Sequence, residues 1–300
     1  MSRNINRREL LLAGAGAAWL GSGVLSRAVG AAAKAPKKVL YFTKSSGFPH
    51  SVVTRKGDAL AHSEKILTEI GKEHGFDVVA SKDGRLFEPD KIGEWDGFVF
   101  CTTGDLTTPG TDKTPPLSAE GEKALYDALR KGKGFIGMHC ATDTFGHHGA
   151  RNKGVEDPYI QMIGGEFVSH GPQQVAVMEV VDPKFPGLPE GFGKSASFKI
   201  NDEWYALKNL PEDLHVILVQ KTEGMEGAMY HRPDFPATWA RKYGDGRVFY
   251  TSMGHREDVW TNPNYQSLLL GALAWTTGLA DADLTPNIKE VTPGYAKLTK

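Results

Sequence analysis

Cysteine, net charge and long apolar runs are all scarce in this 300-residue chain. With only two cysteines, the chain cannot be a disulfide-dense scaffold. Cys101 and Cys140 both lie at the ends of predicted strands, so they could form one disulfide or remain two buried thiols. A formal net charge of −1 gives no basic excess, so neither nucleic acid nor an anionic membrane is indicated as a partner. Beyond the N-terminal segment, no apolar run is long enough to cross a bilayer.

The first 33 residues are typical of an export signal. Arg7 and Arg8 precede an apolar run over about 10–20, and small residues end at Ala33. Paired arginines indicate the twin-arginine route, which exports folded proteins. An uncleaved anchor is the alternative, but the apolar run is short and rich in glycine and alanine. We therefore expect a signal peptide over 1–33, a periplasmic or otherwise exported protein, and a single domain over 34–300 without a membrane span.

Short apolar segments alternate with helical patterns in the first half of that domain. Strands are predicted at 38–43, 76–80, 96–101 and 134–140. A helix is predicted from about 54 to 74, with Leu60 among its apolar residues, and a second helix follows Ser118 as its N-cap. This alternation predicts an α/β fold with a parallel sheet flanked by helices, in which ligands bind at the carboxyl ends of the strands.

The second half is richer in strands and adds antiparallel pairing. Strands are predicted at 174–181 and 215–219, and a hairpin at 238–243 and 247–252 turns at Gly244–Gly246. The helix predicted at 264–277 is apolar on nearly every side, so it should be buried. The polar segment after Asp281 is expected to be a loosely packed extension. No linker or internal repeat divides the domain.

Histidines and carboxylates gather at the predicted strand ends and in the loops that follow them. The set comprises His50, His139, His170, Asp202, Glu203 and His255. Histidine serves as a general base or a metal ligand, and nitrogen ligands with a carboxylate suit zinc or another divalent metal. No H-x-H or H-E-x-x-H spacing is present, so ordinary hydrogen bonding of each histidine to the backbone is the alternative. His147 and His148 are expected in a solvated loop.

The segment Gly137–Ala141 lies where a nucleophile elbow would lie, at a sharp turn between strand and helix. Such an elbow needs serine or cysteine at its centre, whereas this chain has His139 there and Cys140 one residue later. A shift of one residue points a side chain elsewhere. Acyl transfer through Cys140 is therefore only a minor alternative.

Aromatic residues flank these polar candidates. Trp204 and Tyr205 follow Glu203, and Trp260 follows His255 by five residues. Aromatic faces pack against the C–H side of a sugar ring and leave a polar group for hydrogen bonding. We take these three residues and His50 as candidate substrate contacts, with ordinary core packing as the alternative for the aromatic ones.

Taken in order, these motifs resemble the trehalose-utilisation (ThuA-like) family over about 38–278. The motifs are Gly47–His50, Gly137–His139, Gly164–Phe167 with His170, Asp202–Tyr205, and Gly246–Tyr250 with Gly254–His255. The resemblance implies a flavodoxin-like sheet, similar to class I glutamine amidotransferases but without their catalytic cysteine. Pro49 departs from the pattern, where arginine is expected.

The resemblance also implies a role in the use of trehalose and related disaccharides, alongside dehydrogenases that make 3-oxo sugars. A keto group acidifies the neighbouring C2 proton, so a base could start cleavage at C1 by elimination; hydrolysis is the alternative reaction. The expected catalytic residues are His139, Glu203 and His255, with Glu203 or His255 as the base. The expected metal ligands are His139, His170 and His255. A non-catalytic sugar-binding module is the main alternative function.

Overall fold

The computed structural model describes residues 35–145 and 156–298. The predicted signal peptide and the pair His147–His148 lie outside these residues. No helix in the described ranges has the length and apolar character needed to span a membrane.

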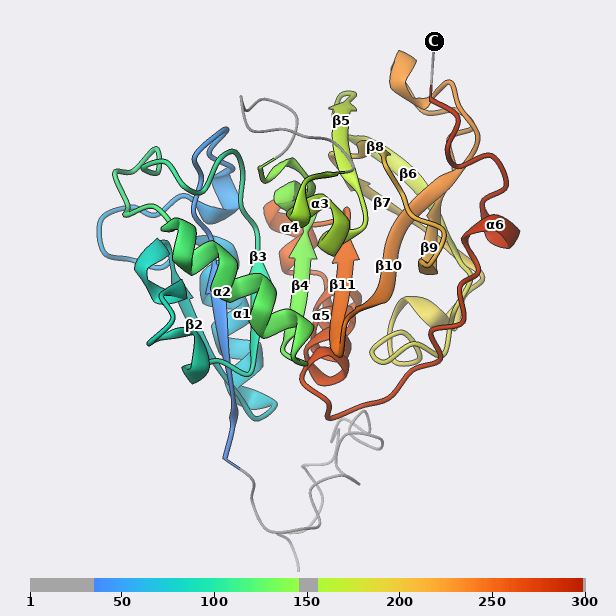
Figure 1. Cartoon of the computed structure of the whole chain (residues 1–300). Coiled ribbons are helices and arrows are strands. Elements are labelled where there is room, and N and C mark those ends of the chain that lie inside the picture. Colours follow the sequence, from blue (N-terminus) through green and yellow to red (C-terminus); the bar gives the residue numbers. More distant parts are fainter. Residues whose placement is uncertain (1–34, 146–155, 299–300) are drawn as a thin grey trace, which may run out of the picture. The chain divides into compact units, whose positions relative to one another are not determined.

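The described residues form a nine-stranded sheet in the order β2-β1-β3-β4-β11-β10-β9-β6-β7, and a separate pair β5-β8. The strands are β1 Lys37–Phe42, β2 Phe76–Ser81, β3 Gly97–Phe100, β4 Gly134–Met138, β5 Glu166–His170, β6 Gln174–Val180, β7 Ser197–Asp202, β8 Tyr205–Lys208, β9 His215–Gln220, β10 Phe235–Tyr243 and β11 Gly246–Thr251. From β2 to β11 all neighbours run parallel, and from β11 to β7 all run antiparallel. This mixed sheet confirms the predicted α/β class (Figure 1).

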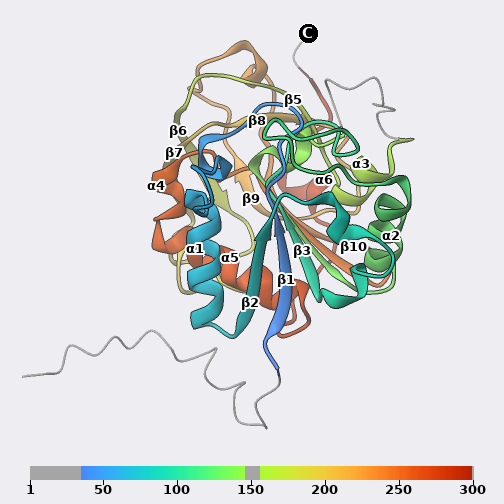
Figure 2. The same ribbon diagram turned by 90° about the vertical axis from the view of Figure 1, so that its left-hand side faces the viewer.

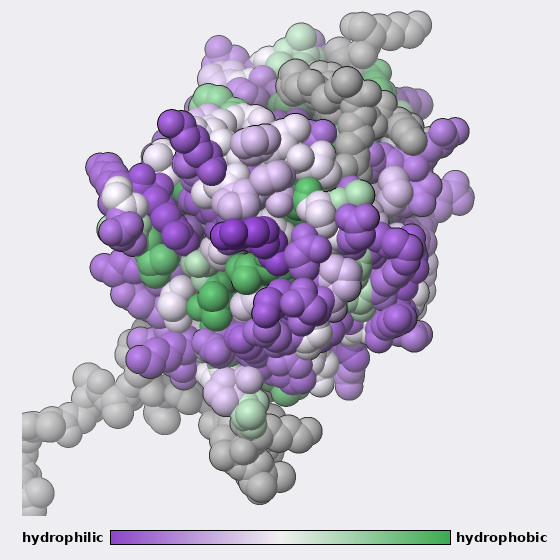
Figure 3. All heavy atoms as spheres, turned by 60° about the vertical axis from the view of Figure 1, so that its left-hand side comes forward, coloured by the Kyte–Doolittle hydropathy of each residue, from purple (hydrophilic) through white to green (hydrophobic). Residues whose placement is uncertain are grey.

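The parallel half is buried on both faces. The helices are α1 His62–Glu73, α2 Ala119–Arg130, α3 Pro158–Ile163, α4 Glu257–Trp260, α5 Pro263–Thr276 and α6 Ile288–Val291. Figure 2 shows α1 and α5 on one side of the strands and α2 on the other. Every residue of β3 and β4 is buried, as expected for central parallel strands with helices on both faces. On the side of the molecule shown in Figure 3, hydrophilic side chains cover most of the surface and surround a smaller hydrophobic patch.

Capping side chains set where two of these helices begin. The Ser118 hydroxyl accepts from the Gly121 N–H at 2.9 Å, which confirms the predicted N-cap of α2. Asn262 accepts from Asn264 N–H at the start of α5, and Pro263 occupies the first turn. As predicted, α5 is buried on nearly all sides and packs against β4 and β11.

The first helix is shorter than the apolar pattern predicted. It begins at His62 because Gly57 adopts φ +61° and Lys56 pairs with Ala59, which turns the preceding segment out of a helical path. The Glu64 carboxylate then accepts from the Ala61 N–H at 2.8 Å and fixes the start. Leu60 is consequently 44% exposed and lies outside the apolar face of α1.

The C-terminal segment is packed against the sheet, contrary to the expected loose extension. Asn287 accepts from the Val216 N–H at 2.7 Å and donates to the Val216 carbonyl at 3.0 Å, so its amide continues the hydrogen bonding of β9. Ile288 is buried in the core. The composition of this segment is polar, so it did not predict these contacts, which come from the amide of Asn287 and the side chain of Ile288.

His215 ties the start of β9 to the same C-terminal segment. Its Nε2 lies 3.1 Å from Asp182 Oδ2, and its Nδ1 lies 2.8 Å from the Thr285 carbonyl oxygen. Burial opposes the charged imidazole, but Asp182 and the Thr285 carbonyl outweigh burial and raise the pKa of His215. Because the folded pKa lies above the unfolded one, this contribution to stability is complete below about pH 6.5 and is lost as pH rises through the folded pKa.

We therefore predict that His215→Gln lowers the free energy of unfolding more at about pH 5.5 than at about pH 8.5. Urea denaturation of the wild type and the variant at both pH values measures this difference. Asp182→Asn removes the partner carboxylate and should abolish the same pH dependence. An equal loss at both pH values in His215→Gln would contradict the assignment.

Candidate functional site

The end of β4 forms the elbow predicted from the sequence, with His139 at its centre. The strand stops at Met138, His139 adopts φ +43°, and a short 3₁₀ turn continues to Asp143. Left-handed backbone is unfavourable for a residue with a Cβ atom, and such strain is typical of functional turns. The His139 carbonyl accepts from the Tyr250 hydroxyl at 2.8 Å, which holds the turn against β11.

One hydrogen bond decides which nitrogen of His139 faces the site. Its Nδ1 lies 3.1 Å from the Ser252 carbonyl oxygen, an acceptor only, so Nδ1 carries the proton. Nε2 then faces the site, and it lies 3.2 Å from His255 Nδ1 and 3.5 Å from Glu203 Oε2. A histidine fixed in this way by a backbone carbonyl is suited to ligate a metal or to accept a proton.

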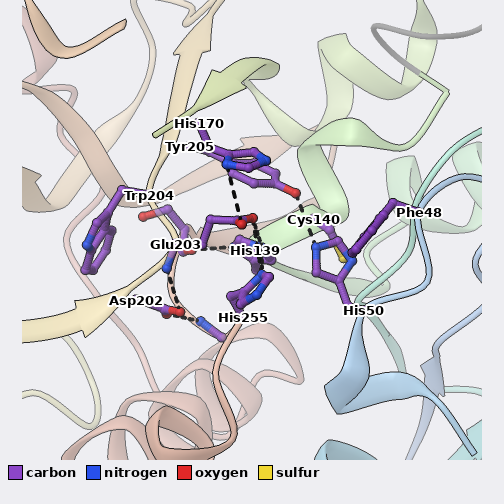
Figure 4. A network of polar contacts seen from close by, with 12 residues as sticks. Phe48, His50, His139, Cys140, His170, Asp202, Glu203, Trp204, Tyr205 and His255 are labelled. Carbon is purple, nitrogen blue, oxygen red and sulfur yellow. Dashed lines mark hydrogen bonds and ion pairs between the residues drawn. The ribbon is translucent and has the colours of Figure 1, made fainter. Parts of the chain in front are cut away.

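The buried carboxylate of Asp202 positions the other two groups. It accepts from the Gly254 N–H at 2.7 Å, the Arg256 N–H at 3.2 Å and the Glu203 N–H at 3.0 Å. Although β7 lies four strands from β11 in the sheet, Asp202 at its end binds the loop after β11. The antiparallel half therefore folds back, and both Glu203 and His255 reach the carboxyl edge of β4 (Figure 4).

Glu203 lies at the centre of the histidines. Its Oε2 is 3.2 Å from His255 Nδ1, and its Oε1 is 3.4 Å from His170 Nδ1. Burial favours the neutral carboxyl, but the hydrogen bonds and charges of His139 and His255 hold the pKa of Glu203 well below its usual range. In return, Glu203 outweighs burial and raises the pKa of His255.

His50 completes the cluster from the loop after β1. It is buried, and its ring centroid lies 5.0 Å from that of His139 and 5.1 Å from that of His255. Burial, together with these two imidazoles, lowers the pKa of His50 to about 2, so it is neutral at ordinary pH. Its buried Nδ1 finds no hydrogen-bond partner among the described residues. An unpaired lone pair or N–H at this depth is costly unless it meets a ligand.

These four side chains could hold a metal ion. One ligand atom each from His50, His139, Glu203 and His255 lie within 4.8 Å of one another. Three imidazole nitrogens and one carboxylate oxygen fit zinc or a related divalent metal. The structure therefore brings together His139 and His255 of the predicted metal set and adds His50 and Glu203. His170 does not belong to the group: its side chain is 43% exposed at the rim.

The aromatic residues need a larger correction. Trp204 and Trp260 are completely buried and donate to the carbonyls of Gln174 and Gly254, so they have no free face for a sugar. Figure 4 shows Trp204 pointing away from His139. Tyr205 is also buried, but its ring packs on His139 at 4.3 Å and its hydroxyl lies 3.5 Å from His50 Nε2. It forms a wall of the site.

The exposed aromatic ring beside the cluster is Phe48, which the sequence interpretation did not single out. Its side chain is 65% exposed, and its ring centroid lies 5.1 Å from that of His50. Its carbonyl accepts from the Thr103 hydroxyl at 2.9 Å, so a fixed backbone presents it. The only sequence clue was its place two residues before His50, because a phenylalanine in a strand-end loop looks like any other core residue.

The cysteines do not take part in the site. Cys101 and Cys140 are free and buried, with their sulfur atoms 3.6 Å apart. Burial, followed by the hydrogen bond to Cys101, raises the pKa of Cys140 well above its usual value, which disfavours the thiolate. The structure thus argues against acyl transfer through Cys140 and agrees with the alternative of two buried thiols.

Comparison with known proteins supports the relationship suggested by the motifs. A ThuA-like protein from Bacteroides uniformis shares 20% identity over 81% of this chain and 93% of its own, with a TM-score of 0.59. One from Parabacteroides merdae shares 17% identity over 88% and 97%, with a TM-score of 0.58. No curated protein sequence matches. The family described as "Trehalose utilisation" matches residues 38–276, and the chain therefore belongs to the ThuA family.

Proposed function

We propose that this protein is an enzyme of trehalose-related sugar utilisation that cleaves 3-oxo glycosides at C1. The observation that carries the proposal is the convergence of His50, His139, Glu203 and His255 at the carboxyl edge of the parallel strands. Strain at His139 and an unpaired Nδ1 on His50 both indicate a site arranged for a ligand. Membership of the ThuA family supports a sugar as that ligand.

The proposed reaction is an elimination. A base removes the proton at C2, which the 3-oxo group acidifies, and the electron pair forms a C1=C2 double bond as the C1–O bond breaks. The proton ends on the oxygen of the departing sugar, so the reaction needs no oxidant or reductant. A divalent metal held by the four-residue group would supply a Lewis acid for the oxygens of the keto sugar.

His170 is the best placed base in this proposal, in place of Glu203 or His255. Its Nδ1 lies 2.9 Å from the Gly171 carbonyl and 3.4 Å from Glu203 Oε1, both acceptors, so in the neutral imidazole Nδ1 carries the proton and Nε2 is the nitrogen that can accept one. Its half-exposed ring stacks on Tyr205 at the rim, where a substrate can reach it. Glu203 then orients His170 and also belongs to the group that could hold a metal.

The proposal predicts turnover of 3-oxo-trehalose that depends on a metal. An NMR time course of the purified protein, with and without EDTA, should show loss of the anomeric signals only in the untreated sample, and added zinc should restore it. Products with a C1=C2 double bond would support elimination, whereas two saturated sugars would indicate hydrolysis. Binding without turnover, also for other 3-oxo glycosides, would overturn the proposal and favour a sugar-binding module.

Two kinds of variant separate the metal group from the base. His139→Gln and Glu203→Gln should lose bound zinc in equilibrium dialysis. His170→Gln should keep zinc but lose about 10²–10⁴-fold in kcat, the range typical of a missing general base. His231→Gln, an exposed histidine, is the control and should change neither. Loss of zinc in His170→Gln would instead support the metal set predicted from the sequence.

Phe48 should contribute a sugar-stacking surface. Covering one aromatic face removes apolar area worth about 1.4 kcal/mol, so Phe48→Ala should raise KM about tenfold with little change in kcat. Phe48→Trp should keep the wild-type KM. Leu279→Ala is a matched control, because Leu279 is also exposed, at 47%. Equal effects of the Phe48 and Leu279 substitutions on KM would argue against a specific contact.

A further inference from the structure

A second pocket, of about 650 Å³, lies outside the carboxyl ends of β1 and β2. None of the four residues that could hold a metal (His50, His139, Glu203 and His255, here called the His–Glu group) lines it. Its polar lining residues include Ser45, Arg55, Ser81, Lys82, Asp112 and Thr114. The volume is within the range of small-molecule sites, and the carboxyl edge of parallel strands is where such sites occur.

Two lysines are buried beside this pocket with few partners. The Lys82 side chain is 7% exposed; its ammonium donates to the Thr43 carbonyl at 2.6 Å and lies 3.8 Å from Asp112, too far for a hydrogen bond. Lys44 is fully buried, and its ammonium donates to the carbonyl and hydroxyl of Thr114. Burial lowers the pKa of both lysines, because it disfavours the charged ammonium more than the nearby carboxylates favour it.

Four cations lie in or beside the pocket, namely Lys44, Lys82, Arg55 and the exposed Arg85, against the three carboxylates of Glu64, Asp83 and Asp112, so one positive charge is in excess. Arg55 pairs with the buried Glu64 at 2.7 Å, and Asp83 pairs with Arg85 at 2.6 Å. Asp112 is then the carboxylate without an arginine partner, although the charges of Glu64 and Asp83 also favour the charged forms of Lys82 and Lys44, respectively. Its Oδ1 already accepts from the Thr114 N–H and hydroxyl, at 3.2 and 2.7 Å.

The backbone of the loop at 110–114 is built closely around these groups. A Cβ atom added to Gly110 would lie 2.3 Å from Thr114 Oγ1, 2.8 Å from Asp112 Oδ1 and 3.0 Å from Lys44 Nζ. Only glycine allows the polar atoms to converge in this way. The three groups also hydrogen-bond to one another through the Thr114 hydroxyl, which fixes the positions of Asp112 and Thr114 in the pocket wall.

We propose that this pocket binds a singly charged oxyanion group, either the carboxylate of a small organic acid or a phosphoryl group, through Lys82 and the hydroxyls beside it. One bound negative charge balances the excess and supplies the acceptors that the Lys82 ammonium lacks. This site is separate from the His–Glu group and does not depend on the proposed elimination.

The test is thermal unfolding of the full chain with sodium phosphate or sodium glucuronate, compared with sodium chloride at equal ionic strength. Binding to the folded state should raise Tm by about 3 °C at saturating anion. The anion that acts distinguishes a phosphoryl group from a carboxylate. Absence of a rise with either anion, up to tens of millimolar, would overturn the proposal.

Two substitutions with opposite charge effects make the test specific. Lys82→Met should abolish the rise in Tm, whereas Asp112→Asn keeps an acceptor for Thr114, removes the competing charge and should tighten anion binding at least threefold. Asp112→Asn keeps the test decisive if Lys82→Met does not fold. Weaker binding in Asp112→Asn, or a rise in Tm that persists in Lys82→Met, would show that the lysines form only a structural ion network.

Discussion

The site depends on one buried carboxylate. Asp202 joins the end of β7 to the loop after β11 by accepting from the N–H groups of Gly254 and Arg256, and it also accepts from the Glu203 N–H; these bonds bring Glu203 and His255 to His139. A buried carboxylate is costly to desolvate, and burial indeed raises the pKa of Asp202 against the opposing influence of His139 and the backbone donors. Here the buried Asp202 carboxylate positions Glu203 and His255, and it connects β7 of the antiparallel half to the loop that follows β11.

Local sequence patterns predicted the parallel half of the fold well, because the signals for buried strands and capped helices come from residues that are close together in the sequence. The Ser118 cap and the apolar α5 are examples. The helix predicted from about residue 54 begins only at His62, because Gly57 turns the chain inside the predicted range. β5 and β8 were also missed, since they pair only with each other across a long stretch of sequence, and β7 was missed because it is an edge strand with few buried residues.

The candidate site was predicted by residue type and position but only partly by role. His139 and His255 were identified because they lie at or after predicted strands, whereas Glu203 was identified from the Asp202–Tyr205 motif. The group that could hold a metal contains His50 in place of the predicted His170. This difference depends on which histidine is buried, and the spacing of residues in the sequence does not reveal burial. Trp204 and Trp260 were misjudged for the same reason: a tryptophan beside a polar motif points into the core as readily as toward a ligand.

The place of β11 in the sheet has a consequence for folding. It lies between β4 and β10, so the last strand of the chain to form joins the parallel half to the antiparallel half. Contacts of such long sequence separation form slowly, because a large loop must close first. During synthesis, His255 emerges after His50, His139 and Glu203, so no chain that ends before residue 255 contains the whole site. Placing β11 between β4 and β10 therefore joins the sheet and also brings the loop that carries His255 to the end of β4.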